Sequence, residues 1–400
     1  MSKPLNGVRI LDLTHMLSGP YGAMILADLG AETIKVEPLH GEGTRKLLAK
    51  DPENSLDGMG AYYITLNRNK QSVAIDLKRD AGKAVFHDLV READVVISNF
   101  GVGVPERLGI DYDTLSAINP RIITCTVTGF GSDGPNPKRP AFDQVAQAMG
   151  GGMSITGPDA DHQVRAGIPI GDLGGGMFAV MGVLSALVER GVSGKGQHVD
   201  ISMLDCQVSM LNYMATMFFL SGKDPYPIGN SHFVHVPYNT FRTADGWIVI
   251  AVITDNFWQN LKDVVNIPEF DDPKYDGQPG RWEDQDMINT RLNETLSQNT
   301  SEYWLAALEA RRIPCAPVNR FSQALSDEQV LHRNMVVDLK HPNGKATRGP
   351  GNPIKLSRTA EESFSAAPEV GQDTDTVLRD LLGYSEERIA ELKAQETIGG

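Results

Sequence analysis

The 400-residue sequence has few cysteines, no apolar run long enough to span a bilayer, and no excess of positive charge. Its three cysteines, Cys125, Cys206 and Cys315, are far apart and form no CxxC pair. That spacing excludes a disulfide framework and a zinc site, and it favours a reducing cytoplasm. The longest apolar runs lie around Met177–Val188 and Leu211–Leu220, and the opening residues lack a signal-peptide layout. We therefore expect a cytoplasmic protein without a metal site.

The formal net charge is −14, which argues against nucleic acid or an anionic membrane as a partner. The negative charge is unevenly spread along the chain. Residues 1–110 contain 13 Lys and Arg against 14 Asp and Glu, so almost all of the excess lies beyond them. We expect a small polyanionic ligand to bind in the first quarter of the chain.

Strand-like and helix-like segments alternate through the first half of the chain, which indicates a doubly wound α/β fold with a parallel sheet. The expected strands are Val8–Leu13, Thr33–Glu37, Ser72–Asp76, Val95–Ser98, Arg121–Thr128 and His198–Met203, with helices at Ala23–Leu29, Ala81–Glu92 and from Gly176 to Arg190.

A Gly- and Pro-rich segment, Gly222–Asn230, reads as a linker. Beyond it, strand-like alternation over Pro237–Val252 precedes helices around Asn256–Val265 and Met287–Arg312. We therefore predict a large domain from residues 1–224 and 330–400, and a smaller α+β domain from residues 225–329.

The first strand, the SGPYG segment and the following helix resemble the start of a dinucleotide-binding unit. Glu37 even lies where a ribose-binding carboxylate is expected. The phosphate loop is wrong, however, because Pro20 lies between Gly19 and Gly22 and has no N–H to offer a pyrophosphate. This sequence favours a doubly wound sheet without a nicotinamide cofactor.

The segment GIPIGDLGGGM places Asp172 beside three glycines, directly before a helical stretch. Glycines let a backbone approach a ligand closely, and a helix N-terminus favours negative charge. A carboxylate in this setting can be a nucleophile, with backbone N–H groups receiving an oxyanion. The alternative reading is an N-cap aspartate followed by glycines that allow tight packing. From this segment alone both readings stand.

Eight segments in order decide between them, because together they resemble the class III CoA-transferases, the formyl-CoA transferase and carnitine CoA-transferase superfamily. They are LNGVRILDLTHMLSGPYGAMILADLGAETIKVEP, LNRNKQSVAIDLK, ADVVISNFGVGVPERLGIDYDTL, NPRIITCTVTGFGSDGP, PAFDQVAQAMGG, IPIGDLGGGM, GKGQHVDISMLD and VPYNTFRTADGWIVIA.

The resemblance implies that Asp172 is the catalytic nucleophile. It would form an aspartyl anhydride and then an aspartyl-CoA thioester, with an acyl-CoA as substrate and no tightly bound cofactor. Gly174, Gly175 and Gly176 are then the candidate oxyanion donors and flap, and Asp143 is a supporting residue whose alternative role is to cap the helix Gln144–Met149. The expected CoA-binding residues are His15, Lys35, Arg68, Lys70, Asn99, Phe100 and Arg107.

Two departures narrow the expected reaction. The segment IGNSHFVHVPY lacks the glycine run of the formyl-CoA and oxalate members, and its pattern is more like members that use succinyl-CoA and dicarboxylic acids. The racemases of the superfamily carry a histidine where this chain has Phe142, and phenylalanine cannot move a proton. An α-methylacyl-CoA racemase and a nicotinamide-dependent oxidoreductase remain the alternatives.

The resemblance also implies self-association as an interlocked homodimer, in which each chain passes through the ring formed by the other. A related subunit in place of the second copy is the alternative. The acceptor acid stays open, because the shape of its pocket depends on scattered loops.

Overall fold

The computed structural model describes residues 3–341, 344–359 and 362–400, and it divides the chain into two compact units. The larger unit contains the chain up to Gly152, Ala166–Met217 and the part from Gln329 onward; the smaller contains Met153–Arg165 and Phe218–Glu328. Each unit is described by itself.

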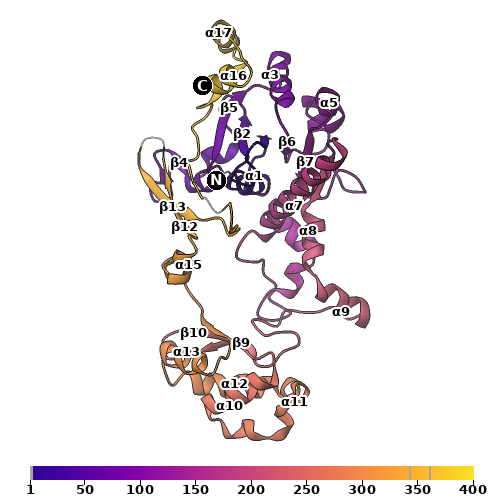
Figure 1. Cartoon of the computed structure of the whole chain (residues 1–400). Helices are drawn as coiled ribbons and strands as arrows, with labels where there is room; N and C mark the ends of the chain where they lie inside the picture. Colours follow the sequence, from indigo (N-terminus) through magenta and orange to yellow (C-terminus); the bar gives the residue numbers. More distant parts are fainter. Residues whose placement is uncertain (1–2, 342–343, 360–361) are drawn as a thin grey trace. The chain divides into compact units, whose positions relative to one another are not determined.

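A seven-stranded sheet forms the centre of the larger unit (Figure 1). Six strands run parallel, in the order β5-β2-β1-β6-β7-β8, and β14 pairs antiparallel with the edge strand β5. Their bounds are β1 Arg9–Asp12, β2 Glu32–Glu37, β5 Lys70–Ile75, β6 Val95–Ser98, β7 Ile123–Thr128, β8 His198–Ser202 and β14 Ile398–Gly399. This is the order 3-2-1-4-5-6 of doubly wound sheets, whose ligands bind where the strand order reverses, between β1 and β6. The sequence predicted this parallel sheet correctly.

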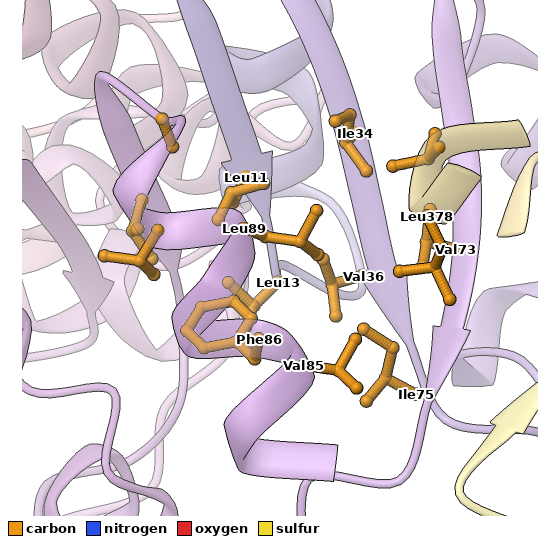
Figure 2. Close-up of a cluster of buried hydrophobic side chains, with 14 of the residues drawn as sticks. Leu11, Leu13, Ile34, Val36, Val73, Ile75, Val85, Phe86, Leu89 and Leu378 are labelled. Atoms are coloured by element: carbon orange, nitrogen blue, oxygen red, sulfur yellow. The ribbon is translucent and has the colours of Figure 1, made fainter. Parts of the chain in front are cut away.

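Helices cover both faces of the sheet. Successive side chains of β1 therefore point into two different hydrophobic cores. Leu11 belongs to the core under α3, whereas Ile10 belongs to the core under α1 and α7. Figure 2 shows Phe86 and Leu89 of α3 lying over strand residues such as Val36. The helices of this unit are α1 Ser18–Asp28, α2 Ala61–Leu66, α3 Asp80–Arg91, α4 Val104–Leu108, α5 Tyr112–Ile118, α6 Asp143–Met149, α7 Ile170–Ser193, α8 Met203–Met210, α16 Thr374–Asp380 and α17 Glu386–Ala394.

Helix α7 begins six residues before the predicted start, so Asp172 and its glycines lie inside the helix. Close packing against α1 explains this. A Cβ on Gly22 would come within 2.9 Å of the Gly176 carbonyl oxygen, and a Cβ on Gly176 within 2.6 Å of the Ser18 carbonyl oxygen. By length and composition α7 could cross a membrane, and 44% of its apolar window is buried, with one side of the helix packed on α1, β7 and β8.

The segment SGPYG is also helical rather than a loop, because α1 begins at Ser18. Proline is tolerated in the first turn of a helix, where the N–H group it lacks would have no partner within the helix.

The C-terminal part of the chain completes the larger unit. The predicted strands and helices did not include its hairpin of β12 (Val336–Lys340) and β13 (Ala346–Pro350), or the strand β14. Thr374 Oγ1 accepts a hydrogen bond from the Ala74 N–H, and Asp373 accepts one from the Ser72 N–H at 2.8 Å. These contacts attach the chain end to β5.

The smaller unit has a three-stranded antiparallel sheet of β9 (Tyr238–Arg242), β10 (Trp247–Ala251) and β11 (Cys315–Pro317). The strand-like alternation predicted over Pro237–Val252 corresponds to the antiparallel pair of β9 and β10. Its core gathers around Trp258 and Phe241, under helices α10 Asp255–Val265, α11 Gln278–Glu283, α12 Gln285–Leu296 and α13 Ser301–Ala310. Short helices α9 (Tyr213–Ser221), α14 (Phe321–Ala324) and α15 (Glu328–His332) lie at or near the boundaries after Met217 and after Glu328.

Candidate active site

A cavity of about 790 Å³ opens at the carboxyl ends of β1, β2, β5 and β6. Its wall contains the acidic residues Glu37, Glu42 and Asp76 together with apolar side chains and cations. The apolar groups and the cations suit a ligand that carries both an aromatic ring and phosphate groups. The lining residues include Leu39, Phe100 and Val104 among the apolar groups and Lys78, Lys83 and Arg107 among the cations. We call this space the nucleotide-side cavity.

A second cavity of about 410 Å³ lies beside it and contains Asp172. His15 and Val104 line both cavities, so the two spaces adjoin. Lys138 and Arg139 add two cations to the second wall. We call this space the Asp172 cavity.

The loop after β1 separates the two cavities and is held by Asn99, at the end of β6. The Asn99 side chain accepts a hydrogen bond from the His15 N–H at 3.0 Å and donates one to the His15 carbonyl at 2.7 Å. The His15 ring lies 5.4 Å from the ring of Phe100. Burial lowers the pKa of His15 and so favours the neutral imidazole. The structure brings together the sequence-predicted residues His15, Asn99, Phe100 and Arg107.

Asp172 lies in the first turn of α7, and the Ser18 hydroxyl donates a hydrogen bond to its backbone carbonyl at 2.8 Å. Burial, followed by the nearby charge of Asp143, raises the pKa of Asp172 to about 6. A carboxylate poorly solvated by water and ionised at neutral pH is a stronger nucleophile than an exposed one.

Asp143 caps a helix other than the one that the sequence suggested. It is the first residue of α6 rather than its N-cap, and it accepts hydrogen bonds from the N–H groups of Gly171 at 2.8 Å and Asp172 at 3.3 Å. Its carboxylate thus caps the first turn of α7, next to the Asp172 side chain.

The predicted oxyanion donors and flap do not correspond to the observed backbone. Gly174, Gly175 and Gly176 are buried within α7, where regular i→i−4 bonds use the N–H groups. The earlier N–H groups of this turn are also engaged, by Asp143 and by the Pro169 carbonyl. These glycines instead allow close packing against α1 and α8.

Three of the predicted CoA-binding cations line neither cavity. Lys35 and Lys70 are buried and donate to the Thr14 carbonyl and the Asp12 carboxylate, at 2.8 and 2.7 Å. Arg68 is buried in a bidentate ion pair with Asp28. Because these three cations are already hydrogen-bonded to protein groups, we withdraw the assignment of Lys35, Arg68 and Lys70 to phosphate binding.

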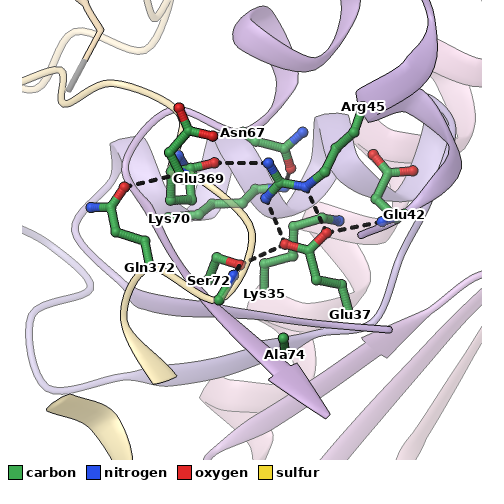
Figure 3. A network of polar contacts seen from close by, with 12 residues as sticks. Lys35, Glu37, Glu42, Arg45, Asn67, Lys70, Ser72, Ala74, Glu369 and Gln372 are labelled. Atoms are coloured by element: carbon green, nitrogen blue, oxygen red, sulfur yellow. Dashed lines mark hydrogen bonds and ion pairs between the residues drawn. The ribbon is translucent and has the colours of Figure 1, made fainter. Parts of the chain in front are cut away.

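Glu37, the residue in the ribose-binding position of a dinucleotide fold, is also fully engaged. Its carboxylate accepts hydrogen bonds from Arg45 at 2.6 and 2.8 Å and from the Ser72 hydroxyl at 2.6 Å. Figure 3 shows the Arg45 guanidinium against this carboxylate, with Ser72 beside it. Glu37 therefore has no oxygen to spare for a ribose, which argues against the oxidoreductase alternative.

Sequence reasoning missed the cavity cations Lys83, Lys138 and Arg139. The signal for the last two was present, since they immediately precede the PAFD segment that contains Asp143.

The family model for "CoA-transferase family III" matches residues 5–374. The chain belongs to this family. It is 34% identical to the mouse "Succinyl-CoA:glutarate CoA-transferase", over 98% of this chain and 89% of the mouse protein. It is 35% identical to the Agrobacterium fabrum "Succinate--glutarate CoA-transferase", over 94% of this chain and 96% of that protein.

A crystal structure of a "CAIB/BAIF family protein from Brucella suis" superposes with a TM-score of 0.85 at 33% identity, covering 95% of this chain and all of that one. The resemblance stated from the motifs is therefore confirmed, and the protein is a class III CoA-transferase, with CoA thioesters and carboxylic acids as its classes of substrate. The racemase alternative has less support, since Phe142 lines the Asp172 cavity where a base would be required.

Proposed function

We propose that this enzyme transfers CoA from succinyl-CoA to a second dicarboxylic acid, and that Asp172 carries first the acyl group and then CoA. The observation that carries the proposal is the position of Asp172 in a cavity that adjoins the nucleotide-side cavity. The relatives named for succinate and glutarate support the choice of dicarboxylates.

The first half of the reaction needs no proton and no metal ion. An Asp172 carboxylate oxygen attacks the thioester carbonyl carbon, the C–S bond breaks, and CoA leaves as a thiolate. The thiolate then attacks the Asp172 carbonyl carbon of the resulting anhydride. Succinate leaves as a carboxylate, and the enzyme holds CoA as an aspartyl thioester.

The second half runs the same steps in reverse with the acceptor acid. Its carboxylate displaces CoA thiolate from Asp172 to form a new anhydride, and the thiolate attacks the acceptor's carbonyl carbon. The Asp172 carboxylate is released unchanged. Each step exchanges one activated acyl bond for another, so the cavity only has to exclude water and hold the thiolate.

The proposed roles of the other residues follow from their positions. Arg107, Lys78 and Lys83 bind the phosphate groups of CoA in the nucleotide-side cavity. His15, held by Asn99, guides the pantetheine arm from that cavity to Asp172, and Lys138 or Arg139 receives the second carboxylate of the acid.

Covalent trapping tests the central claim. After incubation with succinyl-CoA, hydroxylamine or borohydride should leave a modified peptide containing Gly171–Met177, detected by mass spectrometry. Asp172→Ala should remove both the adduct and CoA exchange. Asp205→Ala, on α8 and outside both cavities, is the control and should retain both. Near-native exchange by Asp172→Ala would refute the covalent scheme. A panel of acceptor acids then identifies the second substrate.

The proposal includes an interlocked homodimer in the cytoplasm. An exposed apolar side of α7, with Met181, Val188 and Val192 exposed by 50, 74 and 90%, supports a partner chain. Interlocked chains cannot separate without unfolding, so the particle should keep twice the 43.5 kDa chain mass on dilution to low nanomolar concentration. A folded 43.5 kDa species would exclude interlocking and leave the Asp172 chemistry intact.

A further inference from the structure

A buried amide behind the Asp172 cavity has no role in the chemistry described so far. Gln147 of α6 is only 2% exposed. Its Oε1 accepts a hydrogen bond from the Ala166 N–H at 2.9 Å, and its Nε2 donates to Asp143 Oδ2 at 2.7 Å. The backbone N–H identifies the amide oxygen, so the NH₂ group must face the carboxylate.

Asp143 extends this chain of hydrogen bonds to the reacting residue. Its other oxygen, Oδ1, accepts the N–H groups of Gly171 and Asp172. Gln147 thus joins Ala166, where the chain re-enters the larger unit, to the first turn of α7. Because both of its amide atoms are satisfied in a buried site, this network is rigid and expensive to break.

A second buried glutamine holds the same turn in a different way. Gln207 of α8 is 6% exposed, and its Nε2 donates to the Ile170 carbonyl at 3.3 Å. It supports the backbone of the turn through Ile170 and has no hydrogen bond to Asp143 among the described contacts. Gln147 and Gln207 are therefore a matched pair, of which only Gln147 holds the carboxylate.

We propose that Gln147 is a positioning residue for the reaction, which fixes the first turn of α7 through Asp143 and holds a negative charge beside the Asp172 carboxyl group. The proposal rests on the proposed function of Asp172. Without the Gln147 N–H, the Asp143 carboxyl group loses one of the three donors described above and is free to rotate away from α7. Asp172 then loses both its position and the neighbouring charge.

Other groups near Asp172 must stay constant in the test. His15, Lys138 and Arg139 line the same cavity, and Tyr62 of α2 interacts electrostatically with Asp172. Tyr21 of α1 and Asp205 of α8 are further titratable groups on the helices packed against α7. None of them is altered in the variants below, so a shift in the pH profile reports on Asp143 and Asp172.

The test compares Gln147→Met with Gln207→Met, two substitutions of similar size at similar burial. Gln147→Met should lower kcat roughly ten- to a hundredfold, as expected for a misplaced reacting group. The KM for succinyl-CoA should change by less than about twofold, since the CoA contacts are elsewhere. The acid limb of the kcat/KM profile should move to lower pH, because a negative charge beside Asp172 has been withdrawn. Gln207→Met should lower kcat without moving that limb.

Asp143→Asn provides the second measurement, and thermal unfolding checks that each variant folds. The substitution keeps an acceptor oxygen for the α7 N–H groups and removes the charge, so the acid limb should again move to lower pH. An unshifted limb in folded Gln147→Met overturns the proposal. Should that variant fail to fold, an unshifted limb in Asp143→Asn overturns it. Full activity of Asp172→Ala would instead refute the proposed function itself.

Discussion

Two aspartates of the larger unit, the fully buried Asp12 and the half-buried Asp172, lie in opposite electrostatic surroundings. Burial opposes the ionisation of Asp12, but Lys70 and Lys35 outweigh it and hold the pKa of Asp12 below its usual value. Asp172 has another carboxylate as its neighbour, and burial together with Asp143 raises its pKa to about 6. Burial alone therefore does not make a carboxylate reactive. The paired aspartate supports the fold, and the unpaired one is available to a substrate.

The cations of the first quarter divide in the same way. In the interior, Lys35 is held by Thr14, Arg68 by Asp28 and Lys70 by Asp12. Lys78, Lys83 and Arg107 line the nucleotide-side cavity. Charges that are paired in the interior contribute to stability, whereas charges at a cavity wall are accessible to a ligand.

The largest effect is expected from breaking the buried ion pair between Asp12 and Lys70. Lys70→Met leaves the fully buried Asp12 without its closest cation, which should lower the free energy of unfolding by about 3–5 kcal/mol. Urea unfolding followed by circular dichroism measures this loss. Lys83→Met, at the cavity wall, should cost less than about 1 kcal/mol. If both substitutions cost the same, the distinction between the two sets is wrong. Asp12→Asn in the Lys70→Met background should recover part of the loss.

Arg107→Ala tests the cations that line the nucleotide-side cavity. Losing a charge-assisted contact to phosphate costs about 1.5–3 kcal/mol, so the KM for succinyl-CoA should rise roughly ten- to a hundredfold. The kcat should change little, since the phosphates bind equally in the ground and transition states. Arg68→Met is the matched control, and it should reduce stability while leaving KM unchanged. An unaltered KM in Arg107→Ala would make Arg107 an ordinary surface charge.

The raised pKa of Asp172 predicts an acid limb in the rate profile. The carboxylate must be ionised to attack, so kcat should fall about tenfold for each pH unit below about 6. Above that pH the carboxylate is ionised and the rate should be constant. Measuring kcat as well as kcat/KM removes the ionisation of free succinyl-CoA from the profile. A rate that stays level down to pH 4.5 would show that Asp172 has an ordinary carboxyl pKa and has no buried reactive state.

The smallest effect is expected from salt, which should change the binding of succinyl-CoA at the cavity cations more than the stability that the buried cations provide. Exposed charges are screened by counterions, so the KM for succinyl-CoA should rise about two- to fivefold between about 0.05 and 0.5 M NaCl. The Arg107→Ala enzyme should show a shallower rise. The free energy of unfolding should respond weakly, since the Asp12–Lys70 pair has no access to counterions. Equal salt dependence in native enzyme and Arg107→Ala would remove Arg107 from the phosphate site.

Local sequence pattern predicted the strands better than the helix starts. The strand Val95–Ser98 was predicted exactly as observed, because a run of β-branched residues bounded by polar ones has one clear reading. The start of α7 was placed too late, since consecutive glycines disfavour a helix in isolation. Contact with α1 and α8 determines where α7 begins, because these glycines are the residues that let the helices approach closely.

The sequence by itself determined the doubly wound sheet, the family, and Asp172 as the candidate nucleophile, since periodicity and ordered motifs are properties of the chain. Only the tertiary structure decided which charges are available. Lys70 and Arg107 are both cations of the first quarter, yet one is paired with Asp12 and the other lines a cavity. Likewise, nothing in the PAFDQVAQ segment shows that Asp143 caps a helix beginning 27 residues later. The physical reason is that electrostatic and hydrogen-bond energies depend on distances of a few ångström, which arise only when distant segments pack together.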